Sequence, residues 1–142
     1  MKKIILGGVA GTAVMTMMMY KVAPMILGKP MDIASKLGSM LGDSWALGMM
    51  AHLLNGIIVF PLIYGLFLHK YLPGPNAIKG AVWGVILWLV AMLVVMPVVG
   101  DGAFMLNSGS PKAAMVALMG HIVYGLIFGV VSSSAINIRK SA

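Results

Sequence analysis

The chain has 142 residues, of which 61% are hydrophobic and only 9% are charged. Soluble domains carry about a quarter charged residues, so this composition, with a mean hydropathy of +1.02, excludes an ordinary soluble domain. The ten Lys and Arg, which together with three Asp give a net charge of +7, are scattered and form no nucleic-acid-binding patch. The lack of Cys excludes disulfides and thiolate metal sites.

Four apolar runs are long enough to cross a bilayer, which takes about 20 residues in a helix. In chain order we place these spans at Ile4–Ala23, Trp45–Leu68, Ala77–Val99 and Pro111–Ser132. Strands of a membrane barrel would alternate in segments about half as long. The sequence therefore predicts an all-α bundle of four transmembrane helices in a single domain, residues 1–142. The first run follows two lysines, as in a secretory signal, but it is long and lacks a small-x-small cleavage site.

The segments between the runs contain further local signals. Within Gly28–Asp43, apolar residues recur at helical spacing after Pro30 and Asp32, which predicts a short interfacial helix lying on the outer surface. Asp43 or Ser44 is expected to cap the second helix. The turn before the third helix is rich in Pro and Gly, and Asn76 is expected to cap that helix.

Charges sort between the two ends of the runs. One side has Lys2, Lys3, Lys70, Lys79, Arg139 and Lys140, with no acid among them. The other side has Lys21, Lys29, Lys36 and Lys112, together with Asp32, Asp43 and Asp101. The positive-inside rule therefore predicts that the chain lies in a bacterial cytoplasmic membrane with both termini in the cytoplasm.

The chain also matches itself at two offsets. An offset of 73 residues pairs Ile5, Gly7, Gly11, Met19 and Pro24 with Ile78, Gly80, Gly84, Met92 and Pro97. An offset of 69 residues pairs Met50, His52, Gly56 and Ile58 with Met119, His121, Gly125 and Ile127. The matches predict two parallel repeats of a helix hairpin, related by an axis along the membrane normal.

Residues four apart share one face of a helix, and such faces change character along the first and third helices. Both begin with a Gly-xxx-Gly pair, Gly7 and Gly11 or Gly80 and Gly84, and both end in methionines. Because glycines let helix backbones approach closely, we expect a tight cytoplasmic half and a roomier outer half that is rich in Met.

His52 and His121 are polar, titratable side chains inside apolar runs, where such residues are costly and are usually paired or functional. A structural interpretation gives each a hydrogen bond to a backbone carbonyl or to a polar side chain, with Asn55 and Tyr124 as nearby partners. A second interpretation is a bis-histidine haem b site between the second and fourth helices. Gly56 and Gly125, one turn beyond the histidines, would then clear space for the macrocycle.

A third interpretation is a Cu(I) site, because imidazole and thioether groups suit that metal. Its ligands would be His52, His121, Met19 and Met92. A quinone or a lipid remains open as a further ligand. No carboxylate lies within a span, and no nucleophile has a base beside it, so we expect the chain not to be an enzyme by itself.

Several short motifs resemble a known group of proteins. They are Gly8-Val9-Ala10-Gly11-Thr12-Ala13-Val14-Met15, Met31-Asp32-Ile33-Ala34, His52 with Gly56, Gly120-His121 and Tyr124-Gly125. Together they resemble small uncharacterised four-helix inner-membrane proteins of bacteria, of the YagU-like group. The resemblance implies a fold and a location, and no activity.

These observations favour a structural or accessory subunit of a larger membrane complex, because glycine-faced helices and short loops suit packing against other membrane subunits in the bilayer. The alternative function is electron transfer through haem b bound by His52 and His121.

Overall fold

The fold is seen in a computed structural model that describes residues 2–108 and 111–140, and every regular element within these residues is helical. Four helices are long and apolar enough to cross a membrane. They are Lys2–Leu27, Trp45–Leu68, Asn76–Val98 and Pro111–Ser132. The four predicted runs are thus confirmed, with ends that differ by at most four residues, and the chain is a small multi-pass membrane protein.

Three of the spans are interrupted by π-helical turns. The first consists of α1 (Lys2–Met17), the π turn Met18–Val22 and α2 (Ala23–Leu27). The second consists of α4 (Trp45–Leu54), the π turn Asn55–Val59, α5 (Phe60–Ile63) and a further π turn, Tyr64–Leu68. The third consists of α6 (Asn76–Val90), the π turn Ala91–Val95 and α7 (Met96–Val98), and the fourth is the single helix α8 (Pro111–Lys140).

Each of the three prolines inside these spans follows a π turn that ends two residues before it. A proline has no N–H for the carbonyl four residues back, and its ring clashes with that carbonyl. The wider turn relieves this conflict, because the preceding residue donates its N–H to the carbonyl five residues back. These bonds run from Ala23 to Met18, from Phe60 to Asn55 and from Met96 to Ala91.

The π turns Met18–Val22 and Ala91–Val95 are 73 residues apart, which is the offset of the sequence match between the first and third runs. The second and fourth spans do not share this feature, since the described part of α8 has no π turn. Equivalent glycines also differ, because Gly80 contacts Gly125 whereas Gly7 contacts Phe128. The duplication therefore remains a prediction.

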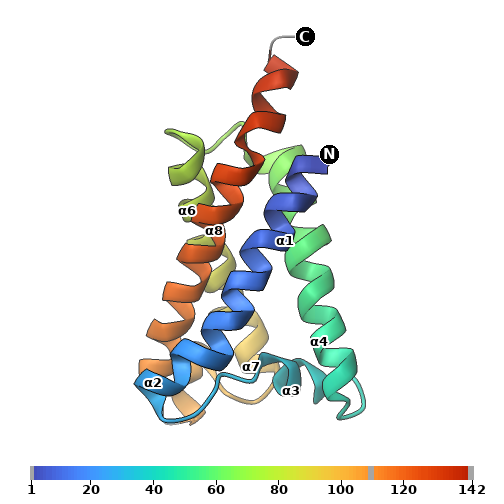
Figure 1. Ribbon diagram of the computed structural model, residues 1–142. Coiled ribbons are helices and arrows are strands. Elements are labelled where there is room, and N and C mark those ends of the chain that lie inside the picture. The colour runs from blue at the N-terminus through green and yellow to red at the C-terminus, as the bar shows by residue number, and fades with distance from the viewer. Residues whose placement is uncertain (1, 109–110, 141–142) are drawn as a thin grey trace.

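The four spans run alternately up and down (Figure 1). α8 packs along both α6 and α1, and the second span packs on the other side of α1. Aromatic rings join the second span to the third, with the ring centroids of Phe60 and Tyr64 6.4 and 6.2 Å from that of Trp83. Both termini and the turn at residues 69–75 lie at one end, and α3 (Ile33–Gly38) lies at the other (Figure 1).

Glycines set the closest helix contacts, as the sequence predicted. A β-carbon on Gly84 would overlap the carbonyl oxygen of His121, and one on Gly80 would overlap that of Gly125. A β-carbon on Gly11 would lie 2.8 Å from the ring of Tyr124. These glycines face the inside of the bundle, so their missing side chains bring α1 and α6 against α8.

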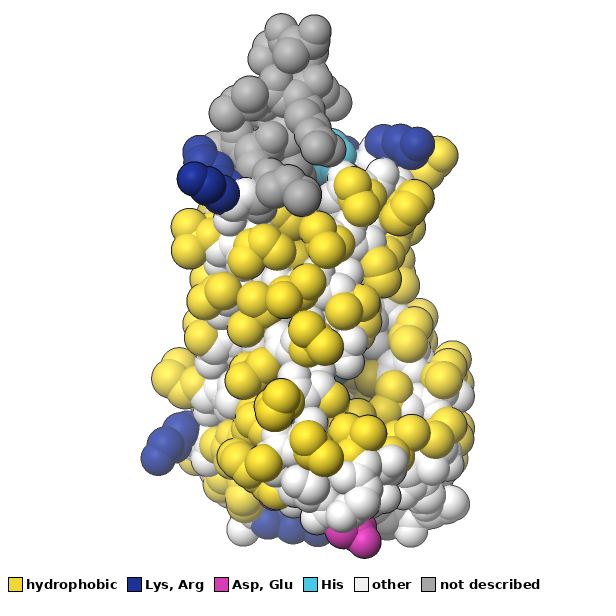
Figure 2. Space-filling view, turned by 90° about the vertical axis from the view of Figure 1, so that its right-hand side faces the viewer, with side chains coloured by type: hydrophobic (Ala, Val, Ile, Leu, Met, Phe, Trp, Pro, Cys, Tyr) yellow, Lys and Arg dark blue, Asp and Glu magenta, His cyan; other side chains and the backbone are white. Residues whose placement is uncertain are grey.

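The outward faces of the bundle are apolar. Large hydrophobic side chains are exposed on all four spans, for example Leu6, Leu54, Leu93 and Val130. Figure 2 shows one side on which apolar side chains cover the middle, while basic side chains lie toward both ends and acidic ones at the lower end alone. This is the surface that a lipid bilayer requires, because charges are costly in its hydrocarbon region.

The caps differ in part from the predicted ones. Ser44 caps α4, since its hydroxyl accepts a hydrogen bond from the N–H of Leu47. Asn76 is the first residue of α6 rather than its cap, and the capping position belongs to Pro75, which has no side-chain group to accept a bond. A short helix, α3, lies between the first two spans, and Asp32 caps it, whereas its predicted position on the membrane surface stays a prediction.

Candidate functional site

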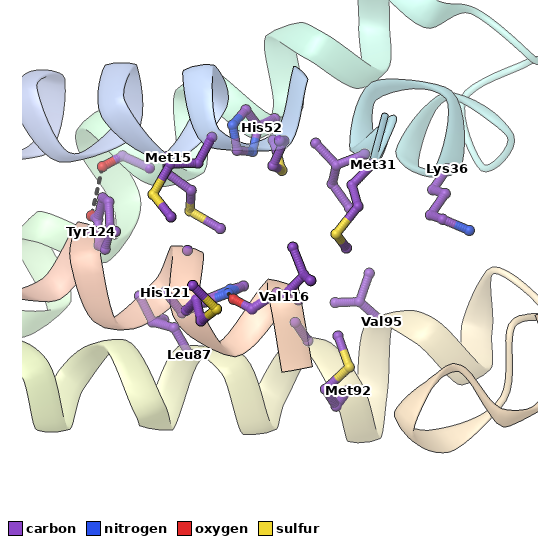
Figure 3. Close-up of a pocket in the computed structure, with 18 of the residues that line it drawn as sticks. Met15, Met31, Lys36, His52, Leu87, Met92, Val95, Val116, His121 and Tyr124 are labelled. Carbon is purple, nitrogen blue, oxygen red and sulfur yellow. Dashed lines mark hydrogen bonds between the residues drawn. The ribbon is translucent and has the colours of Figure 1, made fainter. Parts of the chain in front are cut away.

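A cavity of about 160 Å³ lies in the half of the bundle beyond the glycine contacts (Figure 3). All four spans contribute to its wall, together with α3 and one side chain of the loop before α8. Eight of the lining residues are methionines: Met15, Met18, Met19, Met31, Met92, Met96, Met105 and Met119. Unbranched, polarizable thioethers adapt to irregular spaces, so this wall can adjust to the shape of an apolar guest.

The proline-linked π turns build much of this wall. They supply Met18, Met19, Val22, Asn55, Gly56, Ala91, Met92 and Val95. A π turn inserts an extra residue and moves neighbouring side chains around the helix, and such turns occur often at functional sites. Here one π turn from each of the first three spans meets the same cavity.

The two histidines lie on opposite walls of the cavity (Figure 3). His52 extends from α4 toward α1, where its Nε2 and the Oγ1 of Thr16 are hydrogen-bonded at 3.0 Å. His121 stays closer to its own helix, with Nδ1 2.7 Å from the carbonyl oxygen of Ala117. Both bonds satisfy one nitrogen of a ring that would otherwise be unpaired in an apolar setting.

The bond of His121 fixes its tautomer. A carbonyl oxygen only accepts, so Nδ1 must carry the hydrogen that is donated to Ala117. In the neutral ring Nε2 is then an unprotonated acceptor, and no other residue in the described part of the chain is hydrogen-bonded to it. The cavity therefore contains a polar atom that is fixed in orientation and available to a guest.

Asn55 and Tyr124, which the sequence offered as partners of the histidines, do not fill that role. The Tyr124 hydroxyl crosses from α8 to the second span and donates to the carbonyl oxygen of Gly56 at 2.8 Å. The actual partner of His52, Thr16, stands on a different helix, and local sequence spacing contained no signal for it. The expected hydrogen bond to a backbone carbonyl is present for His121 alone.

α3 and the residues just before it cover the end of the cavity that lies away from both termini, where Met31, Ile33, Lys36 and Leu37 line it. The fit of α3 on α4 is close, since a β-carbon on Gly48 would overlap the carbonyl oxygen of Ala34. The Lys36 ammonium also forms an ion pair with Asp101 in the loop after the third span. α3 and its ion pair therefore connect the segment between the first two spans to the segment between the third and fourth spans.

Asp32 anchors the start of this cover. Its carboxylate accepts hydrogen bonds from Tyr20 at 2.7 Å, from Trp45 at 3.1 Å and from the N–H and hydroxyl of Ser35 at 3.1 and 2.6 Å. Burial by itself would raise the pKa of Asp32, but the bonds from Ser35, Tyr20 and Trp45 outweigh it and hold the pKa below its usual 3.8.

Met105, which also lines the cavity, has an unusual backbone conformation. It has a φ of 59°, and Phe104 before it has a φ of 51°, both in the left-handed region that bulky residues seldom adopt. The side chain of Met105 is nearly buried, and its N–H donates to Gly102 at 3.0 Å. Strain of this kind persists where surrounding contacts fix it, and it concentrates at functional sites.

The structure brings five of the six predicted site residues to one cavity. His52, His121, Gly56, Met19 and Met92 all line it. Gly125 does not, because it packs against Gly80 where α8 crosses α6.

The cavity does not fit haem. Its volume is near that of an engineered apolar cavity of about 150 Å³ that holds benzene, and a porphyrin is several times larger. The helix contact at Gly125 leaves no space on that side for a macrocycle, and Nε2 of His52 is already bonded to Thr16.

The Cu(I) site remains a prediction. Its four proposed ligands, His52, His121, Met19 and Met92, share the cavity, and Nε2 of His121 is open to a ligand. Among the described residues, no group of three or more His, Cys, Asp or Glu side chains could hold a metal ion. A Cu(I) ion would therefore depend on the methionine sulfurs.

Residues 2–142 match the model of one protein family, which is described as a family of unknown function (DUF6789). No curated protein and no solved structure matches the chain.

Proposed function

The chain belongs to the DUF6789 family, whose function is unknown, and we propose from the cavity that it binds a small apolar molecule dissolved in the membrane. The observation that carries this proposal is the composition of the cavity wall. Methionines and other apolar groups surround a space of about 160 Å³, and two histidines face it from opposite sides. Such a mostly apolar pocket with a few convergent polar groups is typical of a small-molecule site.

The size of the cavity limits the guest. An apolar cavity of about 150 Å³ binds benzene in an engineered protein, so a single six-membered ring is the right size here. A longer ligand would place only its ring or chain end inside. The ring of a quinone, a phenol or an aromatic lipid meets this limit.

The way into the cavity lies in the lipid-facing part of the wall. Three of its lining side chains are also exposed on the outer surface: Ile26 at 49%, Val90 at 45% and Met119 at 49%. α3 lines one end of the cavity, and the helices touch at their glycines beyond the opposite end. A guest that enters beside such residues comes from the bilayer, which concentrates apolar molecules.

A variant that fills the cavity tests the proposal. Val116 lines the cavity, and Met115 before it is exposed on the outside of the same helix. With the protein in lipid nanodiscs, 4-fluorotoluene and 4-fluorophenol serve as ring-sized probes in ¹⁹F NMR. At least one probe should show a saturable bound signal in the parent and in Met115→Phe, and none in Val116→Phe. If both probes only partition into lipid, as in empty nanodiscs, the proposal is wrong.

The expected role as an accessory subunit concerns a different surface. Its support is the apolar outer face, which lipid or another membrane protein can cover equally well. Extraction from native membranes in a mild detergent, followed by native electrophoresis, tests this role. A subunit would migrate with a larger complex, whereas a protein that acts alone would migrate at the size of a monomer or small oligomer.

A further inference from the structure

We infer that the cavity selects a guest that carries a hydroxyl group, such as a phenol or a quinol ring, over an apolar ring of the same shape. The inference rests on the proposed function, since it concerns the guest of the same cavity. It follows from the direction of one hydrogen bond, between His121 and Ala117, and from the single free ring nitrogen that this bond leaves.

The first step is the fixed tautomer of His121. Nδ1–H donates to the carbonyl oxygen of Ala117 at 2.7 Å, one helical turn back in α8. Rotating the ring would break this bond and would leave the N–H unpaired among apolar side chains. The ring is thus held with Nε2 as a hydrogen-bond acceptor.

The second step is the surroundings of that acceptor. His121 lines the cavity, and its neighbours there are apolar groups, among them Met92, Leu87 and Val116 (Figure 3). None of these donates a hydrogen bond. Two other polar groups of the wall are engaged elsewhere, since Tyr124 donates to Gly56 and Nε2 of His52 is bonded to Thr16. The buried hydroxyl of Thr12, which also lines the cavity, has no hydrogen-bond partner among the described residues.

The third step concerns the guest. A hydroxyl group donates to an unprotonated Nε2, whereas a quinone carbonyl, an ether or a hydrocarbon offers no hydrogen. An apolar ring would leave the acceptor unpaired after expelling any water from it, and an unpaired buried polar atom is costly. At Nε2 of His121 the site therefore favours a hydroxyl-bearing ring over an apolar ring of the same shape.

The probe pair named above separates this inference from the proposed function. 4-Fluorophenol and 4-fluorotoluene differ by a hydroxyl in place of a methyl group, so they share a shape. We expect the phenol to bind about tenfold more tightly, after correction for partition into empty nanodiscs, as one hydrogen bond allows. His121→Phe should remove the preference while binding of 4-fluorotoluene persists, and Met115→Phe should leave both unchanged.

Equal or reversed affinity for the two probes would overturn the inference and leave the proposed function standing, whereas failure of both probes to bind would overturn both. A measurement that needs no variant checks the tautomer directly. The ¹⁵N spectrum of labelled protein should show Nε2 of His121 unprotonated, with a shift that changes when 4-fluorophenol is added. A protonated Nε2 in the neutral ring would contradict the inference.

Discussion

Gly80 and Gly125 face each other where α6 crosses α8, and each lies so close that a β-carbon on it would overlap the carbonyl oxygen of the other. Their contact belongs to a row of such approaches, which continues with Gly84 against His121. The row closes one half of the bundle and leaves space in the other half, where the methionines are. The position of the cavity therefore follows from where the glycines end.

Two glycines of one helix test this packing. Gly125→Ala should destabilise the protein by about 1–3 kcal/mol, because the added methyl group meets backbone that cannot move without separating α6 from α8. Gly120→Ala is the matched control, since its nearest neighbour would be Met15 at 3.7 Å. Thermal unfolding in detergent measures both. Equal melting temperatures for the two variants would show that α6 and α8 do not touch at Gly125.

The bond between His52 and Thr16 should have a modest, measurable coupling. A double-mutant cycle with Thr16→Val and His52→Leu isolates it from the separate effects of each change. Interhelical hydrogen bonds in membrane proteins contribute about 0.6 kcal/mol on average, and we expect a coupling of that size. Effects that add completely would mean that the two side chains are not bonded in the membrane.

The prolines should control the cavity through their π turns. Pro97 is exposed, so Pro97→Ala removes no buried contact and restores an N–H that can bond four residues back. We expect the turn Ala91–Val95 to become α-helical, Met92 to shift in the wall, and 4-fluorophenol to bind more weakly. Pro111→Ala, at the start of α8 where proline is tolerated, is the control. Unchanged binding in both variants would show that the π turn and the cavity wall do not depend on Pro97.

The anchor of α3 should be sensitive to acid. Because hydrogen bonds lower the pKa of Asp32 below 3.8 in the folded chain, its carboxylate stabilises the fold above that value. This contribution should be lost as the pH falls below 3.8 and through the lowered pKa. The melting temperature of the parent should therefore drop between about pH 6 and about pH 3 by more than that of Asp32→Asn.

Asp43→Asn controls for the loss of one charge, and asparagine tolerates the φ of 58° at that position. It should keep the acid sensitivity of the parent. An Asp32→Asn variant that melts with the parent's pH dependence would remove Asp32 as the cause.

The charge distribution predicts which end faces the cytoplasm. Single cysteines can be placed at Ser39, next to α3, and at Tyr71, in the turn at the opposite end, and both residues are exposed. In intact bacterial cells, an impermeant thiol reagent should label Ser39→Cys, while Tyr71→Cys should react only after the membrane is opened. The reverse pattern would invert the orientation derived from the positive-inside rule.

The sequence by itself determined the membrane class, the four spans and the glycine faces on which the first and third helices approach their neighbours. Lengths and composition fix the spans, because hydrocarbon tolerates few structures besides an apolar helix of about 20 residues. The Gly-xxx-Gly faces at Gly80 and Gly84 were readable for a similar reason, since a missing side chain is a local property that permits close approach.

Tertiary structure alone decided the partners of the histidines and the shape of the cavity. Thr16 meets His52 only because α1 and α4 cross at that depth, and the fate of Gly125 depended on which helix α8 packs against. The π turns were only partly predictable from the sequence. Pro24, Pro61 and Pro97 were visible in the sequence, but that their wider turns all meet one space follows from the way three helices are arranged around it.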